Sequence, residues 1–164
     1  MDKLVAELIE LLRLLLGAHG RLLAIATARR EAMRLFDVGG MNDLLERERQ
    51  ELAGVQGLEQ QRRNLIARFG PVLGRGVAAT TGEIANRCQE PRRTQVLTLA
   101  AELRSVVEKL DRESRINVKV SQGVVKSLSK VMQVITGMAQ HAGLYMRNGR
   151  KTTMAGMHLL DAVG

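Results

Sequence analysis

The sequence predicts an all-α fold: an elongated, antiparallel, coiled-coil-like bundle of long helices with one short extra helix and a flexible C-terminal tail. One apolar seam at spacings of three and four runs from Val96 to Tyr145 without a proline, which is the period of one side of an α-helix. Only Phe36, Phe69 and Tyr145 are aromatic, whereas sheet proteins rely on aromatic and β-branched runs between turns. A helix of about 50 residues spans about 75 Å, so it has to pack along other long helices.

The first helix is expected over residues 2–36. Leucines recur on one of its faces, and Gly17 and Gly20 weaken its middle. The segment 37–40 ends in paired glycines, which favour left-handed and extended conformations, so it is expected to break the helix.

The second helix is expected over residues 42–69, with Asn42 as its cap. Glycines and Pro71 then predict a loop from Gly70 to Gly76, and Thr80 to Glu83 fits a capping box for a short helix over residues 81–89. Short connections imply antiparallel neighbours. The expected apolar positions of the second helix are Leu45, Leu52, Val55, Leu65, Ile66 and Phe69.

The last long helix is expected to start at Pro91 and to end at Asn148 and Gly149. Glu113 and Asn117 fall on its seam, where the register predicts apolar side chains. A structural role in fixing register is favoured over a binding role there. Residues 1–150 are expected to form a single helical-bundle domain, and residues 151–164 a mobile C-terminal tail that binds a client. The expected seam comprises Val96, Leu99, Leu103, Val106, Leu110, Val120, Val124, Leu128, Val131, Ile135, Met138, Ala142 and Tyr145.

Charge and cysteine content indicate the compartment and the kind of partner. Cys88 is the only cysteine, and the apolar run Leu11–Leu16 contains Arg13 and follows two glutamates, so a cytoplasmic, soluble protein is expected rather than a secreted or membrane-inserted one. The net charge is +8, and residues 114–164 carry seven Lys or Arg against Asp161 alone. Such a surface should attract an acidic protein, a nucleic acid or an anionic membrane.

Nothing in the sequence predicts an enzyme, a metal site or a cofactor. The three histidines are scattered, and His19 fits a packed or boundary position on the first helix. Residues 74–79 match the loose G-x-G-x-x-G/A nucleotide pattern, which has meaning only after a β-strand. Cys88 is expected to be an inert thiol without a small-molecule substrate.

Methionine is concentrated at the C-terminal end. Five of the eight methionines lie in the last 33 residues. Methionine packs adaptably against irregular apolar partners, so this end is either a peptide-binding surface or ordinary core, with neither favoured. The five are Met132, Met138, Met146, Met154 and Met157.

Across nearly its whole length the chain resembles the FlgN family of flagellar type III export chaperones. The resemblance rests on a Leu-rich first helix, a charged second helix with LLERERQEL and LEQQRRNLI, a short capped helix, and a long helix that carries Asn117 and ends in YMRNGR. It implies a cytoplasmic chaperone that holds hook-filament junction proteins of the FlgK and FlgL type and delivers them to the export gate. A departure is that family members are often acidic, so this basic chain should prefer a more acidic client.

The resemblance also implies site residues. Tyr145 and Gly149 match the family's Tyr and Gly and are expected to dock on the export-gate component. The end of the last helix and the tail are expected to engage the client's C-terminal helical segment. The client-binding residues expected here are Met138, Met146, Met154, Met157, Leu159 and Leu160.

Two other functions stay open. One is a generic coiled-coil adaptor or a self-associating structural protein, in which the Met-rich tail packs onto another copy of the chain. A nucleic-acid-binding module is supported only by the basic last third, which lacks interleaved aromatics and any nucleic-acid motif.

Overall fold

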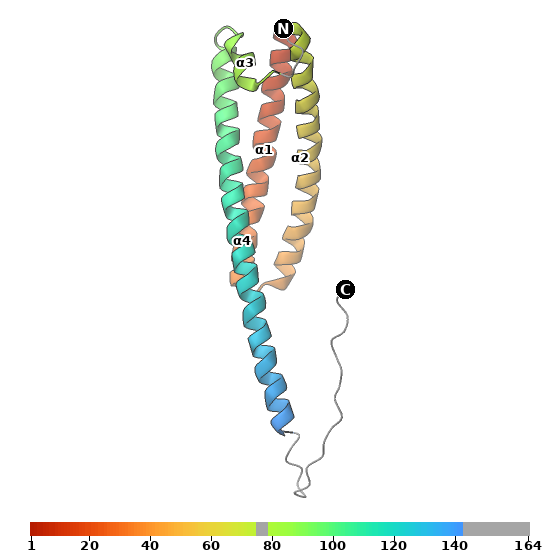
Figure 1. Cartoon of the computed structure of the whole chain (residues 1–164), viewed down its shortest axis with the longest axis vertical. Helices are drawn as coiled ribbons and strands as arrows, with labels where there is room; N and C mark the ends of the chain where they lie inside the picture. Colours follow the sequence, from red (N-terminus) through yellow and green to blue (C-terminus); the bar gives the residue numbers. More distant parts are fainter. Residues whose placement is uncertain (75–78, 143–164) are drawn as a thin grey trace, which may run out of the picture. The chain divides into compact units, whose positions relative to one another are not determined.

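The computed structural model of the protein describes residues 1–74 and 79–142, with only the backbone described for residues 138–142. These ranges are all-α, as predicted, and contain no strand. Four helices follow one another along the described chain (Figure 1): α1 (Asp2–Arg34), α2 (Val38–Val72), α3 (Thr81–Asn86) and α4 (Arg92–Ala142). None of the helices in these ranges combines the length and apolar character needed to cross a lipid bilayer.

The turn between α1 and α2 is tighter than the sequence predicted. After the C-cap Leu35, Phe36 takes φ 54°, while its N–H donates to the Met33 carbonyl and the Asp37 N–H donates to the Ala32 carbonyl. These two bonds form the Schellman pattern that ends many helices, with Phe36 at the left-handed position that usually holds glycine. The chain therefore reverses within three residues.

The break between the first two helices exists but lies at residues 35–37 rather than 37–40, because α2 already begins at Val38 and is capped by Asp37 rather than by Asn42. The Asp37 carboxylate accepts a hydrogen bond from the Gly40 N–H at 2.9 Å. A Cβ atom on Gly40 would lie 2.2 Å from Asp37 Oδ2. Glycine at this position thus makes room for the cap instead of breaking the helix.

The expected loop at Gly70 and Pro71 starts later than predicted, since α2 continues to Val72. A proline in the last turn of a helix removes one N–H donor, and here that donor would have served the carbonyl of exposed Ala67. The N–H of Leu73 closes the turn by donating to the Phe69 carbonyl at 2.9 Å.

The short helix and the start of α4 follow the prediction closely. Thr80 and Glu83 form a capping box, with the Glu83 N–H donating to Thr80 Oγ1 at 3.2 Å and the Thr80 N–H donating to Glu83 Oε2 at 2.8 Å. The helix ends at Asn86, three residues before the expected end. Pro91 directly precedes α4, where its missing N–H costs no helical hydrogen bond.

The chain forms two compact units by its backbone contacts, the first comprising Met1–Ser121 and the second starting at Gln122. In the first unit, α1 and α2 are antiparallel, and the backbone contacts between them are the most extensive between described helices. Most buried side chains lie on α1, and α2, α3 and Val96 of α4 complete the main core. Leu45 and Leu52, which were expected on the core face of α2, are exposed. The main core comprises Val5, Leu8, Ile9, Leu11, Leu12, Leu15, Leu65, Ile66, Phe69, Ala79, Ile84, Ala85 and Val96.

We predict that Phe69→Ala destabilises the protein by about 3–5 kcal/mol, because Phe69 is fully buried and its loss leaves a cavity in the main core. Chemical denaturation followed by circular dichroism at 222 nm measures the change. Phe36→Ala is the matched control, since Phe36 is exposed and the same substitution should cost less than about 0.5 kcal/mol. Equal costs at the two positions would contradict this description of the core.

Candidate functional site

The apolar seam of α4 changes its surroundings along the helix. Its seam residues from Val96 to Leu110 are buried or half-buried within the first unit. From Val125 to Ile135, large apolar side chains keep 54–61% of their surface exposed. We call the apolar surface of this second segment the α4 stripe; it comprises Val125, Leu128, Val131, Met132, Val134 and Ile135, together with half-buried Val124.

An exposed apolar surface of this kind is unusual on a soluble helix. Single exposed apolar residues are common, but contiguous patches mark interaction sites. Fully burying one such side chain is worth about 1.5–3 kcal/mol, so a partner that covers the stripe gains a large driving force. The stripe is therefore the strongest candidate binding surface among the described residues.

The charge around the stripe has one sign. Exposed Lys126 and Lys130 lie on the same stretch of α4, and the sequence has no acidic residue between Glu113 and Asp161. The remaining polar residues from 122 to 136 are the uncharged Gln122, Ser127, Ser129, Gln133 and Thr136. The surface thus combines apolar side chains with cations and lacks carboxylates of its own.

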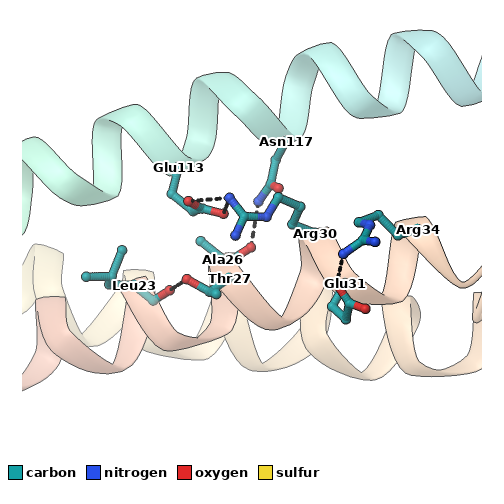
Figure 2. A network of polar contacts seen from close by, with 8 residues as sticks. All are labelled: Leu23, Ala26, Thr27, Arg30, Glu31, Arg34, Glu113 and Asn117. Atoms are coloured by element: carbon teal, nitrogen blue, oxygen red, sulfur yellow. Dashed lines mark hydrogen bonds and ion pairs between the residues drawn. The ribbon is translucent and has the colours of Figure 1, made fainter.

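Within the first unit, Asn117 and Glu113 of α4 each make a polar contact with α1. Figure 2 shows Asn117 and Glu113 pointing from α4 toward α1. Asn117 keeps only 2% of its surface exposed, and its Nδ2 donates to the Ala26 carbonyl at 2.8 Å. The Arg30 guanidinium binds the Glu113 carboxylate, with Nη1 lying 2.7 Å from Oε1 and 3.0 Å from Oε2. Both seam positions singled out by the sequence therefore contact α1.

These contacts fix the register of α4 along α1. Asp2 pairs with Arg92 near the start of both helices, and Ala26 pairs with Asn117 further along, so the two helices run parallel at a nearly constant offset. Asn117 Oδ1 is buried without a hydrogen-bond partner among the described residues, which costs stability. A buried amide that makes one specific bond at such a cost is typical of a residue that specifies register.

The described residues give no support for catalysis. No group of three or more His, Cys, Asp or Glu side chains within the described ranges could hold a metal ion. The Cys88 thiol donates to the Ile84 carbonyl at 3.2 Å, and burial raises the pKa of this thiol, so little thiolate forms near neutral pH. The Nδ1 atom of half-buried His19 is hydrogen-bonded to the Leu15 carbonyl at 2.9 Å, as expected for a boundary histidine. Most of the glycine-rich segment 74–79 lies outside the described residues.

The comparison with known families decides the identity. A family model described as FlgN protein matches residues 1–153. The chain belongs to the FlgN family. Neither the curated proteins nor the solved structures include a match. Membership confirms the resemblance seen in the sequence and gives this FlgN protein a role as a flagellar export chaperone that binds flagellar proteins.

Most of the site residues predicted for this FlgN protein lie outside the described part of the chain. Met138 belongs to α4, but its side chain is not described. The structure therefore leaves these roles as predictions. The residues beyond the described part are Tyr145, Met146, Gly149, Met154, Met157, Leu159 and Leu160.

Sequence reasoning missed part of the stripe that the structure exposes. The strict spacing of three and four selected Leu128, Val131 and Ile135 but passed over Val125 and Val134, which lie beside that line. The additional apolar residues could have predicted a wider apolar surface, because a helix that packs on one neighbour needs only a narrow apolar seam. The FlgN protein thus presents a wider surface than the seam alone indicated.

We predict that Asn117→Leu raises the free energy of unfolding by about 1 kcal/mol, since it removes a buried oxygen that has no partner. It should also weaken the preference for one register, so that size-exclusion chromatography with light scattering detects additional association states. Lys119→Leu adds the same side chain at an exposed position and serves as the control. A loss of more than about 2 kcal/mol without any change in association would show that the Asn117 bond is mainly stabilising.

Proposed function

We propose that this FlgN protein binds hook-filament junction proteins of the FlgK and FlgL type in the cytoplasm, prevents their premature association, and delivers them to the flagellar type III export apparatus. The α4 stripe is the observation that carries the proposal. It offers exposed apolar side chains at helical spacing, and the FlgN family binds flagellar proteins. An amphipathic helix of a client can bury its apolar face there.

The physical requirements of a chaperone fit this surface. A client segment that would otherwise form a coiled coil with other copies of the client has an apolar face along its helix. The chaperone has to cover that face along its length, which requires an extended surface rather than a pocket. A partner helix on the stripe supplies that cover through side-chain burial and needs no chemical step. Such a contact is reversible, as release at the export apparatus demands.

The proposed client-binding surface continues beyond the stripe. It includes Met138 at the end of α4 and the adaptable apolar residues that follow, with the C-terminal tail (residues 151–164) as the segment that completes client capture. The basic charge of residues 114–164 favours a client with acidic character. The residues concerned are Met138, Met146, Met154, Met157, Leu159 and Leu160.

Delivery is assigned to a separate position. We propose that Tyr145 and Gly149 dock the loaded chaperone on a component of the export gate, on the basis of the family resemblance of YMRNGR. Tyrosine suits such a contact because its ring buries a large area while its hydroxyl group forms a hydrogen bond.

Self-association is the alternative that the stripe itself also favours. A generic coiled-coil adaptor would cover the same side chains with a second copy of the chain. The two functions differ in what the purified protein does alone, because an adaptor of this kind is an oligomer without a client.

We predict that deleting residues 151–164 leaves the helicity and the thermal midpoint nearly unchanged but abolishes the capture of a co-expressed junction protein. A segment of this length is too short to fold independently, so the helices should remain, whereas its isolated apolar cluster is the proposed contact with the client. Circular dichroism and affinity co-purification measure the two effects. Loss of folding on deletion would instead support the self-associating alternative, and salt-sensitive retention of DNA would support a nucleic-acid-binding protein.

We predict that Tyr145→Ala preserves client binding and reduces export of the junction protein, because the proposed role of the ring is contact with the export gate. Co-purification measures the first and the amount of secreted junction protein the second. Tyr145→Phe, which keeps the ring, is the control. Loss of client or of folding in the Ala variant would mark Tyr145 as a packing residue.

A further inference from the structure

We infer that the α4 stripe is covered by two helices of the bound client, and that the helix on the Val134 side carries acidic residues. This rests on the proposed function, because it takes the occupant of the stripe to be a client. It goes further in specifying how many helices the client contributes and where their charges lie.

The width of the stripe is the first argument. Successive residues of an α-helix are about 100° apart around the axis, so Met132 and Val134 lie about 200° apart and face nearly opposite directions. Both keep more than half of their surface exposed, at 61% and 55%. Ile135 and Leu128 lie on the arc between them. The apolar surface therefore spans about 180° of the helix circumference, interrupted by the small hydroxyl side chain of exposed Ser127 between Val134 and Val131.

A single partner helix cannot cover that arc. A helix that packs on one neighbour by knobs-into-holes contacts needs only a narrow apolar seam. A helix that packs against several neighbouring elements has a wider apolar face. One client helix on the centre of the stripe would leave either Met132 or Val134 in water. Two adjacent client helices, each packed on one half of the arc, cover both.

The two borders of the stripe differ in charge, which is the second argument. Lys130 and Lys126 follow Val134 around the helix, at about 40° and 80° from it. The other border, next to Met132 and Val125, holds uncharged Ser129 and Thr136. All four of these polar residues are exposed. A client helix on the Val134 side meets two cations, whereas its neighbour meets none.

The same charges disfavour a second copy as the occupant. Residues 114–142 contain no acidic side chain, so the stripe of another copy brings only more lysine to the lysine border. Like charges brought together at an interface cost free energy, while Asp or Glu on a client helix gains it. Charge complementarity thus selects a client with acidic residues beside its apolar face.

Three consecutive residues allow a direct test on the full-length protein. Met132→Asp and Val134→Asp each place a charge on one border, and Gln133→Asp places the same charge on the polar side between them. Ile135→Asp probes the centre. Binding of each variant to a purified junction protein of the FlgK type is measured by isothermal titration calorimetry, and circular dichroism checks that each variant folds.

We predict that Met132→Asp, Val134→Asp and Ile135→Asp each weaken binding at least tenfold and that Gln133→Asp weakens it less than threefold. Loss at Ile135 and at one border only would overturn the two-helix inference and leave the proposed function standing. Unchanged binding in all four variants would overturn the proposed function as well. A dimer of the protein alone that the stripe variants dissociate would assign the stripe to self-association and overturn both.

Two double variants with the same change in net charge test whether the client helix beside Val134 is acidic. The double variant K126E/K130E should lose at least tenfold in affinity at low salt, with a smaller loss at high salt. The double variant R112E/K119E makes the same change in net charge at exposed positions earlier on α4 and should lose less than threefold. Equal losses in the two double variants would show that the overall charge, and not an acidic client helix beside Val134, determines the effect.

Discussion

The difference in length between the helices constrains the rest of this protein. The helix α4 has 51 residues, whereas α1 has 33 and α2 has 35. At 1.5 Å per residue, α4 is longer than either by roughly 25 Å. An amphipathic helix of that length carries more apolar surface than its shorter neighbours can cover. The seam residues of α4 from Val96 to Leu110 are buried or half-buried, whereas the apolar side chains of the α4 stripe are exposed.

The buried polar contacts determine which part of α4 the first unit uses. An apolar seam alone permits a slide by one heptad at little cost, because leucine and valine at successive turns are nearly interchangeable. Asn117 breaks that equivalence through its bond to the Ala26 carbonyl, and Glu113 adds an ion pair with Arg30. The register that satisfies both contacts places the seam residues from Val96 to Leu110 against the first unit's core. The stability lost at Asn117 Oδ1 is consistent with a choice of register over maximal stability.

The sequence predicted the elements of the fold better than their ends or their surroundings. The seam of α4, the capping box at Thr80 and the polar positions Glu113 and Asn117 follow from periodicity and local hydrogen bonding, which act between residues close in sequence. The end of α1 differs from the prediction because Phe36 takes the left-handed position of a Schellman turn, and the start of α2 differs because Gly40 serves the Asp37 cap. Composition reveals neither contact. Leu45 and Leu52 were expected in the core but are exposed. Helical periodicity shows that two residues share a face, but it does not show whether a neighbouring helix packs against that face. The α4 stripe was unpredictable for the same reason, because the helical periodicity of α4 is the same in its buried part and in its exposed part.

On α4, apolar surface and charge contribute differently to binding: apolar burial mainly affects affinity, and charge mainly affects the choice of partner. Burial of the apolar side chains would supply most of the affinity for the proposed client, but it favours any apolar partner, including another copy of the chain. The lysines penalise a partner that brings more cations and favour one that brings carboxylates. A surface that is both apolar and free of acidic residues can therefore remain unpaired in the absence of a client and still accept one. Because this discrimination is electrostatic, it weakens with salt, whereas the contribution of apolar burial does not.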